Sequence, residues 1–161
     1  MPTSWSWFTF WLLVHLLAVA VALGPTFVFP LIIRLSERRP RHAVFGKELD
    51  VLIQTRLVLP ALLVAGLSGI GLIVTANVDP AGSEWLLISL GLYAVLLAFS
   101  VAIQLPATRR AVVLLRDAAG GDPSPKLAAV NRQLRRAGGV LSILFLSILV
   151  LMIWRPGAAV G

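Results

Sequence analysis

The sequence predicts an all-α protein, a four-transmembrane-helix bundle, on the basis of three observations. Hydrophobic residues make up 58% of the chain and charged residues only 13%, about half the charged share of a soluble domain. The apolar residues gather into four runs, each near the ~20 residues that a transmembrane helix needs. Because lipid offers the backbone no hydrogen-bond partners, each run must be helical.

The four runs fill most of the chain, so we expect a single transmembrane four-helix domain over residues 1–161. The predicted spans are residues 8–33, 51–76, 85–106 and 138–155. The first span contains Gly24, Pro25 and Pro30, which predict a tilt or a kink in it. It is too long for a cleaved signal peptide, and no Lys or Arg precedes it, so we expect a retained helix.

The second span contains a cluster of small residues, which are Ala65, Gly66, Ser68, Gly69 and Gly71. A short turn with Asp79 leads to the third span. Before the fourth span, Ser124 is a predicted helix N-cap and Pro125 a predicted first helical residue. The third helix is therefore expected to extend beyond the membrane, and the fourth to begin before it.

The basic residues indicate how the helices cross the membrane. Of the 14 Lys and Arg residues, all but Arg155 lie in or next to the first and third loops, whereas the second loop carries Asp79 and Glu84. Positively charged loops stay in the cytoplasm, so the N-terminus and the C-terminus are both predicted outside. The five tryptophans agree, because Trp prefers the membrane interface and all five fall at the outer ends. We expect a multi-pass protein of the bacterial cytoplasmic (inner) membrane.

The residue inventory excludes several function classes. The chain has no cysteine, which rules out disulfides, thiolate metal sites and cysteine nucleophiles. Its net charge of +7 is explained by topology and by contact with anionic lipid, so we expect no nucleic-acid partner. The spans contain no paired carboxylates, no Ser/His/Asp set and no phosphate-binding loop.

His15 is the only histidine within a predicted span, and an ionisable side chain in the hydrocarbon marks a functional site by default. At about 1.5 Å per residue, it lies roughly 10 Å below the outer surface. Gly66, Gly69 and Gly91 are expected at the same depth. Two interpretations remain open. His15 ligates haem iron in a gap that the glycines leave, or it hydrogen-bonds a neighbouring helix and the glycines serve close packing.

Met152 and Arg56 are the remaining candidates for a cofactor site. Met152 lies near the outer end of the fourth span and is either a second metal ligand beside His15 or a flexible side chain that fills a packing gap. Arg56 enters the second span from the inner side. It either extends to the cytoplasmic headgroups, or turns inward to pair with Glu48 or Asp50 or to hold a propionate or quinone headgroup.

Three stretches of the chain resemble an uncharacterised bacterial family of small four-helix integral-membrane proteins, and the likeness covers nearly the whole sequence. The stretches are residues 15–27, 56–71 and 151–156. That family is similar in turn to the CopD-like copper-resistance proteins and the HemJ-type protoporphyrinogen oxidases. These begin with a His on the first helix, followed by a Gly and an aromatic-Pro step, here His15, Gly24 and Phe29-Pro30. HemJ-type proteins bind haem, so the resemblance implies that His15 is a haem ligand.

We expect a haem-b-binding integral membrane protein with a redox role, either electron transfer or the oxidase-like activity of a membrane oxidoreductase. Its surroundings are the lipid bilayer and either a membrane-protein partner or further copies of the chain in a homo-oligomer. The competing function is a non-catalytic accessory or scaffold subunit that packs against a larger membrane complex through its glycine faces. A copper or small-solute permease ranks third, because the spans offer few polar or soft ligands.

The predicted orientation is tested by reporter fusions. A reporter that is active only in the periplasm should be active when fused after Gly161 and inactive when inserted within residues 120–124, because the basic loop stays in the cytoplasm. The opposite pattern of activity would overturn the orientation.

Overall fold

The computed structural model describes residues 6–37, 40–80, 82–117 and 125–155. In these residues six α-helices follow one another: α1 (Trp7–Glu37), α2 (Pro40–Ile53), α3 (Leu59–Thr75), α4 (Glu84–Phe99), α5 (Leu105–Asp117) and α6 (Pro125–Trp154). Two π-helical segments, η1 (Gln54–Val58) and η2 (Ser100–Gln104), join α2 to α3 and α4 to α5. Within the described ranges there is no strand, so the all-α prediction is confirmed.

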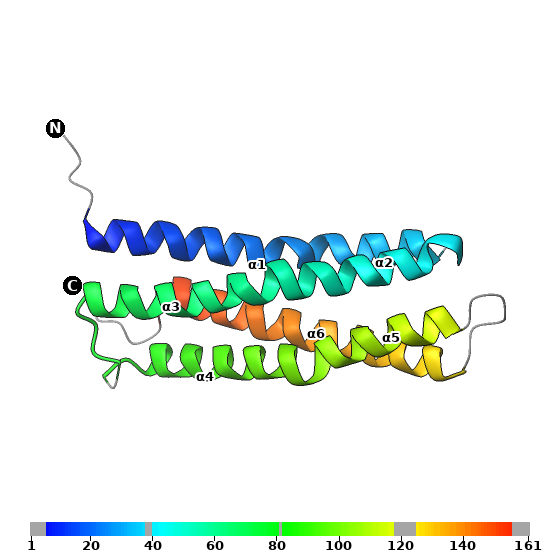
Figure 1. Ribbon diagram of the computed structural model, residues 1–161. Coiled ribbons are helices and arrows are strands. Elements are labelled where there is room, and N and C mark those ends of the chain that lie inside the picture. The colour runs from blue at the N-terminus through cyan, green and yellow to red at the C-terminus, as the bar shows by residue number, and fades with distance from the viewer. Residues whose placement is uncertain (1–5, 38–39, 81, 118–124, 156–161) are drawn as a thin grey trace.

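The helices combine into four long rods that lie side by side (Figure 1). Since α2, η1 and α3 form one continuous helix and α4, η2 and α5 another, the described residues contain four stretches that are long and apolar enough to cross a membrane. These stretches are Trp7–Pro25, Val44–Thr75, Glu84–Asp117 and Pro125–Trp154. The predicted bundle of four transmembrane helices is confirmed.

Some helix boundaries differ from the predicted spans. The second rod extends beyond its predicted span to the start of α2, because that part carries charged residues that a hydropathy pattern does not include. The third rod extends past its span to the end of α5, as expected. Helix α6 begins at Pro125 as predicted, while the expected N-cap, Ser124, lies outside the described residues. Helix α1 continues through Pro25 and Pro30, since neighbouring groups can satisfy the backbone that a proline frees in a membrane helix.

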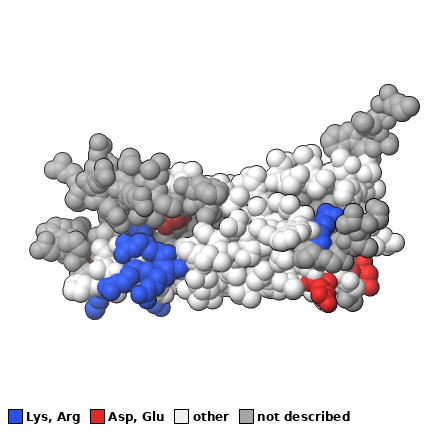
Figure 2. All heavy atoms as spheres, turned by 180° about the vertical axis from the view of Figure 1, so that it is seen from behind, with Lys and Arg blue, Asp and Glu red and all other residues white. Residues whose placement is uncertain are grey.

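The two ends of the bundle differ in charge. Helix α1 begins and α6 ends at the same end, beside the turn between α3 and α4, and we call this the terminal end (Figure 1). Helices α2, α5 and the start of α6 form the opposite end, which we call the basic end. Figure 2 shows Lys and Arg side chains gathered at the basic end, and a largely uncharged surface between the ends on the face it draws. The charge difference is present in the structure, and which end faces the cytoplasm stays a prediction.

Large apolar side chains cover the middle of the bundle from outside. Leu67 is 66% exposed and Ile143 is 68% exposed, and both lie well inside their rods. A contiguous apolar surface of this kind marks an interaction with a membrane or another protein. On four rods that are long enough to span a bilayer, these side chains contact the acyl chains.

The rods pack differently at the two ends. In the basic half, α2 packs against α1 and α5, and α5 packs against α6. Ala107 and Ala111 are buried there with Leu127 and Leu134. In the terminal half, α1 packs against α3 and α4 against α6, but few close backbone contacts join one pair to the other. The bundle is therefore closed in the basic half and divided into two helix pairs in the terminal half.

Tyr93 on α4 joins the two helix pairs. Its hydroxyl donates a hydrogen bond to the carbonyl oxygen of Leu62 on α3, at 2.7 Å. Its phenol lies against Gly66, where a Cβ atom would come within 2.5 Å of the hydroxyl oxygen. Trp11 of α1 occupies the space at Gly71 in the same way, since a Cβ there would lie 2.5 Å from its ring. These two glycines of the predicted small-residue cluster therefore admit aromatic side chains from other helices.

Tyr93→Phe should weaken the contact between the helix pairs, because it removes one interhelical hydrogen bond. Such bonds are worth about 0.6 kcal/mol on average in a membrane protein and up to about 1.7 kcal/mol. We expect a loss of that size in the free energy of unfolding, measured in detergent. Ser142→Ala is the matched control, since the Ser142 hydroxyl bonds the carbonyl of Gly138 in its own helix. Equal stability of Tyr93→Phe and the wild type would contradict the bridging role.

Candidate functional site

His15 lies on α1 and faces α3. Its Nδ1 atom is 2.9 Å from the carbonyl oxygen of Ala65 and 3.2 Å from Oγ of Ser68. Gly69 lies beside the ring, where a Cβ atom would be 3.5 Å from Cε1 of His15. The half-buried imidazole is therefore held at the contact between the two helices of one pair.

These hydrogen bonds determine which ring nitrogen of His15 carries the proton. A carbonyl oxygen only accepts, so Nδ1 must donate to Ala65. The Ser68 hydroxyl donates to the carbonyl of Val64, at 2.7 Å, which leaves its oxygen as a second acceptor for the Nδ1 proton. In the neutral form of the ring, which has one N–H, Nε2 then carries the lone pair, and no residue in the described ranges hydrogen-bonds it. Metal-binding histidines commonly have this arrangement, with the other nitrogen donating to a carbonyl.

A cavity of about 520 Å³ lies between the two helix pairs, and His15 is one of its wall residues. The cavity extends from Trp85 and Arg155 near the terminal end to Leu62 and Leu96 in the middle of the bundle. Its walls are mostly apolar, and its size falls within the range of small-molecule sites, roughly 300–1,000 Å³. The division of the bundle into two pairs thus creates space for a ligand at the depth of His15.

The structure brings together four of the predicted site residues. His15, Gly66, Gly69 and Met152 all line the cavity. The Tyr93 phenol lies against Gly66, and the His15 ring lies against Gly69. These glycines therefore serve close packing and also form part of the cavity wall.

Gly91 and Arg56 lie elsewhere. Gly91 is on the exposed side of α4, and a Cβ atom there would have no neighbour within 4 Å. Arg56 is exposed in η1, toward the basic end, and Glu48, one of the two partners considered for an inward Arg56, pairs with Arg116. Neither Gly91 nor Arg56 lines the cavity.

Three further residues contribute to the site, and two of them have a signal in the sequence. Tyr93 is the single tyrosine of the chain, and Arg155 is the one basic residue outside the two basic loops. Ser68 is fully buried and supports His15, but its role depends on how α3 is rotated toward α1. No pattern in the residues of an apolar helix indicates that rotation.

The side chains able to ligate haem iron are few in this cavity. In the part of the chain that the structure describes, no three His, Cys, Asp or Glu side chains are grouped so that they could hold a metal ion. Among the cavity residues, His15, Met152 and Tyr93 are of the types that ligate haem. The Tyr93 hydroxyl already bonds Leu62, which leaves the imidazole and the thioether as the candidates.

Comparison with known proteins agrees with the membrane architecture. No curated protein and no solved structure matches the chain, and the wider likeness to CopD-like and HemJ-type proteins stays a prediction. A family of predicted integral membrane proteins matches residues 9–156, a range that includes nearly all of the four rods and of the cavity wall. The chain therefore belongs to this family, DUF2269.

Proposed function

We propose that the protein binds haem b in the cavity between the helix pairs, with Nε2 of His15 as an axial ligand, and serves in membrane electron transfer or an oxidase-like reaction. One observation carries the proposal. Nδ1 of His15 donates to the carbonyl of Ala65, which leaves Nε2 with its lone pair on a residue of the cavity wall. A purely structural role for His15 would explain the hydrogen bond at Nδ1, but it would give no function to the free lone pair of Nε2.

The cavity residues fit a haem. The apolar walls suit the porphyrin ring, and the guanidinium of Arg155 would pair with a propionate at the terminal end. Arg155 lies over the Trp85 ring, 5.6 Å from its centroid, so a cation–π contact holds it there. Met152 lines the same cavity and would supply a second ligand. Haem, when bound, supplies one-electron chemistry.

The chain's own residues would orient this ligand and exclude water. Ala65 and Ser68 hold the imidazole of His15 in one orientation, and donation from Nδ1 makes Nε2 a more basic ligand. On the side of the cavity toward the basic end, a buried cluster around Leu62 and Leu96 closes the bundle. Water from that end is therefore kept away from the ligand.

The predicted orientation would place the cavity in the outer half of the bacterial cytoplasmic membrane, because the basic end is expected inside. A redox partner would then reach the ligand from the terminal end or from within the lipid. A copper or small-solute permease is less well supported, since the residues that line the cavity stop at the buried cluster around Leu62 and Leu96.

A second candidate function is that of an accessory or scaffold subunit. It is favoured by Gly91 and Gly139, two exposed glycines where a Cβ atom would meet nothing within 4 Å. Small residues let transmembrane helices approach closely. These faces would receive a helix of a larger membrane complex or of a second copy of the chain.

His15→Ala should abolish haem absorption, because it removes the axial ligand while the apolar helices still insert into the membrane. The measurement is the absorption spectrum of detergent-purified protein produced with haem supplied. The wild type should show a Soret band that shifts on reduction with dithionite. If His15 serves packing alone, the wild type is colourless and the substitution costs about 0.6–2 kcal/mol of stability, as for other interhelical hydrogen bonds. Haem kept at full occupancy in His15→Ala would identify another residue as the ligand.

Gly69→Leu should lower the haem-to-protein ratio, because the added side chain lies next to the His15 ring and takes up space in the cavity. Gly91→Leu is the matched control, since it adds the same side chain on the exposed face of α4 and should leave the ratio unchanged. A scaffold subunit would behave in the opposite way. It would lose association with its partner in Gly91→Leu, as measured by size-exclusion chromatography in mild detergent.

A further inference from the structure

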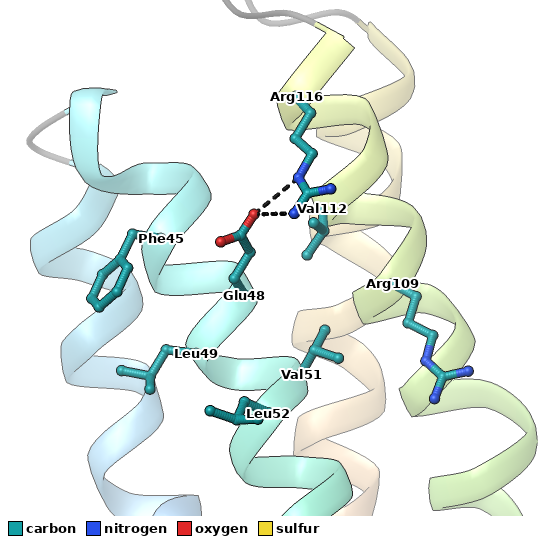
Figure 3. A pocket seen from close by; sticks show the side chains of 8 residues that line it. All are labelled: Phe45, Glu48, Leu49, Val51, Leu52, Arg109, Val112 and Arg116. Carbon is teal, nitrogen blue, oxygen red and sulfur yellow. Dashed lines mark hydrogen bonds and ion pairs between the residues drawn. The ribbon is translucent and has the colours of Figure 1, made fainter.

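A second hollow lies at the basic end, on the surface between α2 and α5 (Figure 3). It has a volume of about 450 Å³, and it shares no residue with the cavity described above. Its α2 wall is mainly apolar. Phe45, Leu49 and Leu52 recur at helical spacing and so form one stripe along α2. Phe45 is 65% exposed and Leu52 is 54% exposed, so this stripe faces the surroundings of the bundle.

The α5 wall carries two arginines. Arg109 and Arg116 are two helical turns apart, about 10 Å along the axis, and lie on the same face of α5. Arg116 extends across to α2, where its Nε and one Nη donate to the same carboxylate oxygen of Glu48, at 2.9 and 2.6 Å (Figure 3). Arg109 forms no hydrogen bond or ion pair with any residue that the structure describes. Two positive charges and one negative charge leave the groove with a net charge of +1.

The groove lies at the boundary between hydrocarbon and headgroups. The hydrocarbon core of a bilayer is about 30 Å thick, and the bilayer with its headgroup layers about 40–45 Å. At about 1.5 Å per residue, Leu52 lies roughly 34 Å from Thr75 and Arg109 roughly 37 Å from Glu84, and both reference residues are at the terminal end. Arg109 is therefore at the level of the lipid phosphates, and Leu52, the residue of the stripe nearest the terminal end, adjoins the ends of the acyl chains nearest the headgroups.

We propose that this groove binds one anionic phospholipid, with its phosphodiester at Arg109 and an acyl chain that begins at Leu52 and runs from there toward the middle of the bilayer. The net charge of the groove matches the single negative charge of a phosphodiester, and guanidinium pairs with phosphate through charge-assisted hydrogen bonds. Basic pockets between transmembrane helices bind anionic headgroups in this way. A zwitterionic lipid would bring a further positive charge beside the arginines, so the anionic lipid is preferred.

Glu48 controls the charge that the lipid meets. Its ion pair with Arg116 neutralises one of the two arginines, and its carboxylate repels a second negative charge on a headgroup. The groove is therefore suited to a headgroup with one negative charge. Removing the Glu48 charge should strengthen the binding of an anionic lipid, and removing the Arg109 charge should weaken it.

Native mass spectrometry of the full-length protein tests the proposal, with release from nanodiscs that contain equal amounts of phosphatidylglycerol and phosphatidylcholine. The wild type should retain one phosphatidylglycerol in preference. Arg109→Gln should reduce the retained phosphatidylglycerol about tenfold, as expected for the loss of one charge-assisted hydrogen bond to its phosphate. It should also lower the preference, because one positive charge fewer repels the choline group, and Glu48→Gln should raise the preference. Arg132→Gln is the matched control, because Arg132 is exposed on α6 outside the groove, and it should leave the preference unchanged.

Three results would overturn the proposal. Equal losses in Arg109→Gln and Arg132→Gln would show that surface charge alone attracts the lipid. Equal retention of both lipids by the wild type would show that the groove selects no headgroup. Displacement of the lipid by inorganic phosphate would show that the acyl chain plays no part. The haem content of the same samples should not change in any of these variants. The test of the lipid groove is therefore independent of the test of the haem cavity.

Discussion

The need to satisfy every backbone hydrogen bond within the helices controls the rest of this structure. The small hydroxyl side chains bond within their own helices as well, since Ser68, Ser89 and Ser100 each donate to the carbonyl four residues earlier. Contact between the rods is therefore left to apolar packing and to very few polar side chains. In the terminal half, the side chains of His15 and Tyr93 form hydrogen bonds from rod to rod.

Both of these side chains bond α3, and this explains where the cavity forms. His15 and Tyr93 donate to the carbonyls of Ala65 and Leu62, less than one helical turn apart. The imidazole is short and lies against Gly69, so α1 is close to α3. The phenol is longer and holds α4 farther away. The polar contacts that stabilise the terminal half therefore also determine the width of the ligand site.

Three properties are predictable from the sequence: the class of the fold, the number of transmembrane helices and the charge difference between the ends. They depend only on hydropathy and on the positions of Lys and Arg along the chain. Depth is predictable too, since a residue count correctly places Gly66 and Gly69 near His15. The side of its helix on which a residue lies is not predictable in this way. Gly91 was expected at the same depth, yet it is on the exposed side of α4. Helices that are apolar all round have no polar face to indicate which side is buried.

The two π-helical segments lie where the bundle changes its packing. At about 1.5 Å per residue, Val58 and Ser100 are each about 25 Å from the terminal end. On the basic side of this level α2 packs against α5, and on the terminal side α3 packs against α1 and α4 against α6. In each segment one N–H donates to the carbonyl five residues earlier. These bonds run from Leu59 to Gln54 and from Leu105 to Ser100.

A π-helical turn holds more residues than an α-helical turn, so it changes the direction of the side chains that follow without breaking the rod. Each rod can therefore present one face in the closed half, where the lipid groove has its two walls, and another in the divided half, where the cavity has its space.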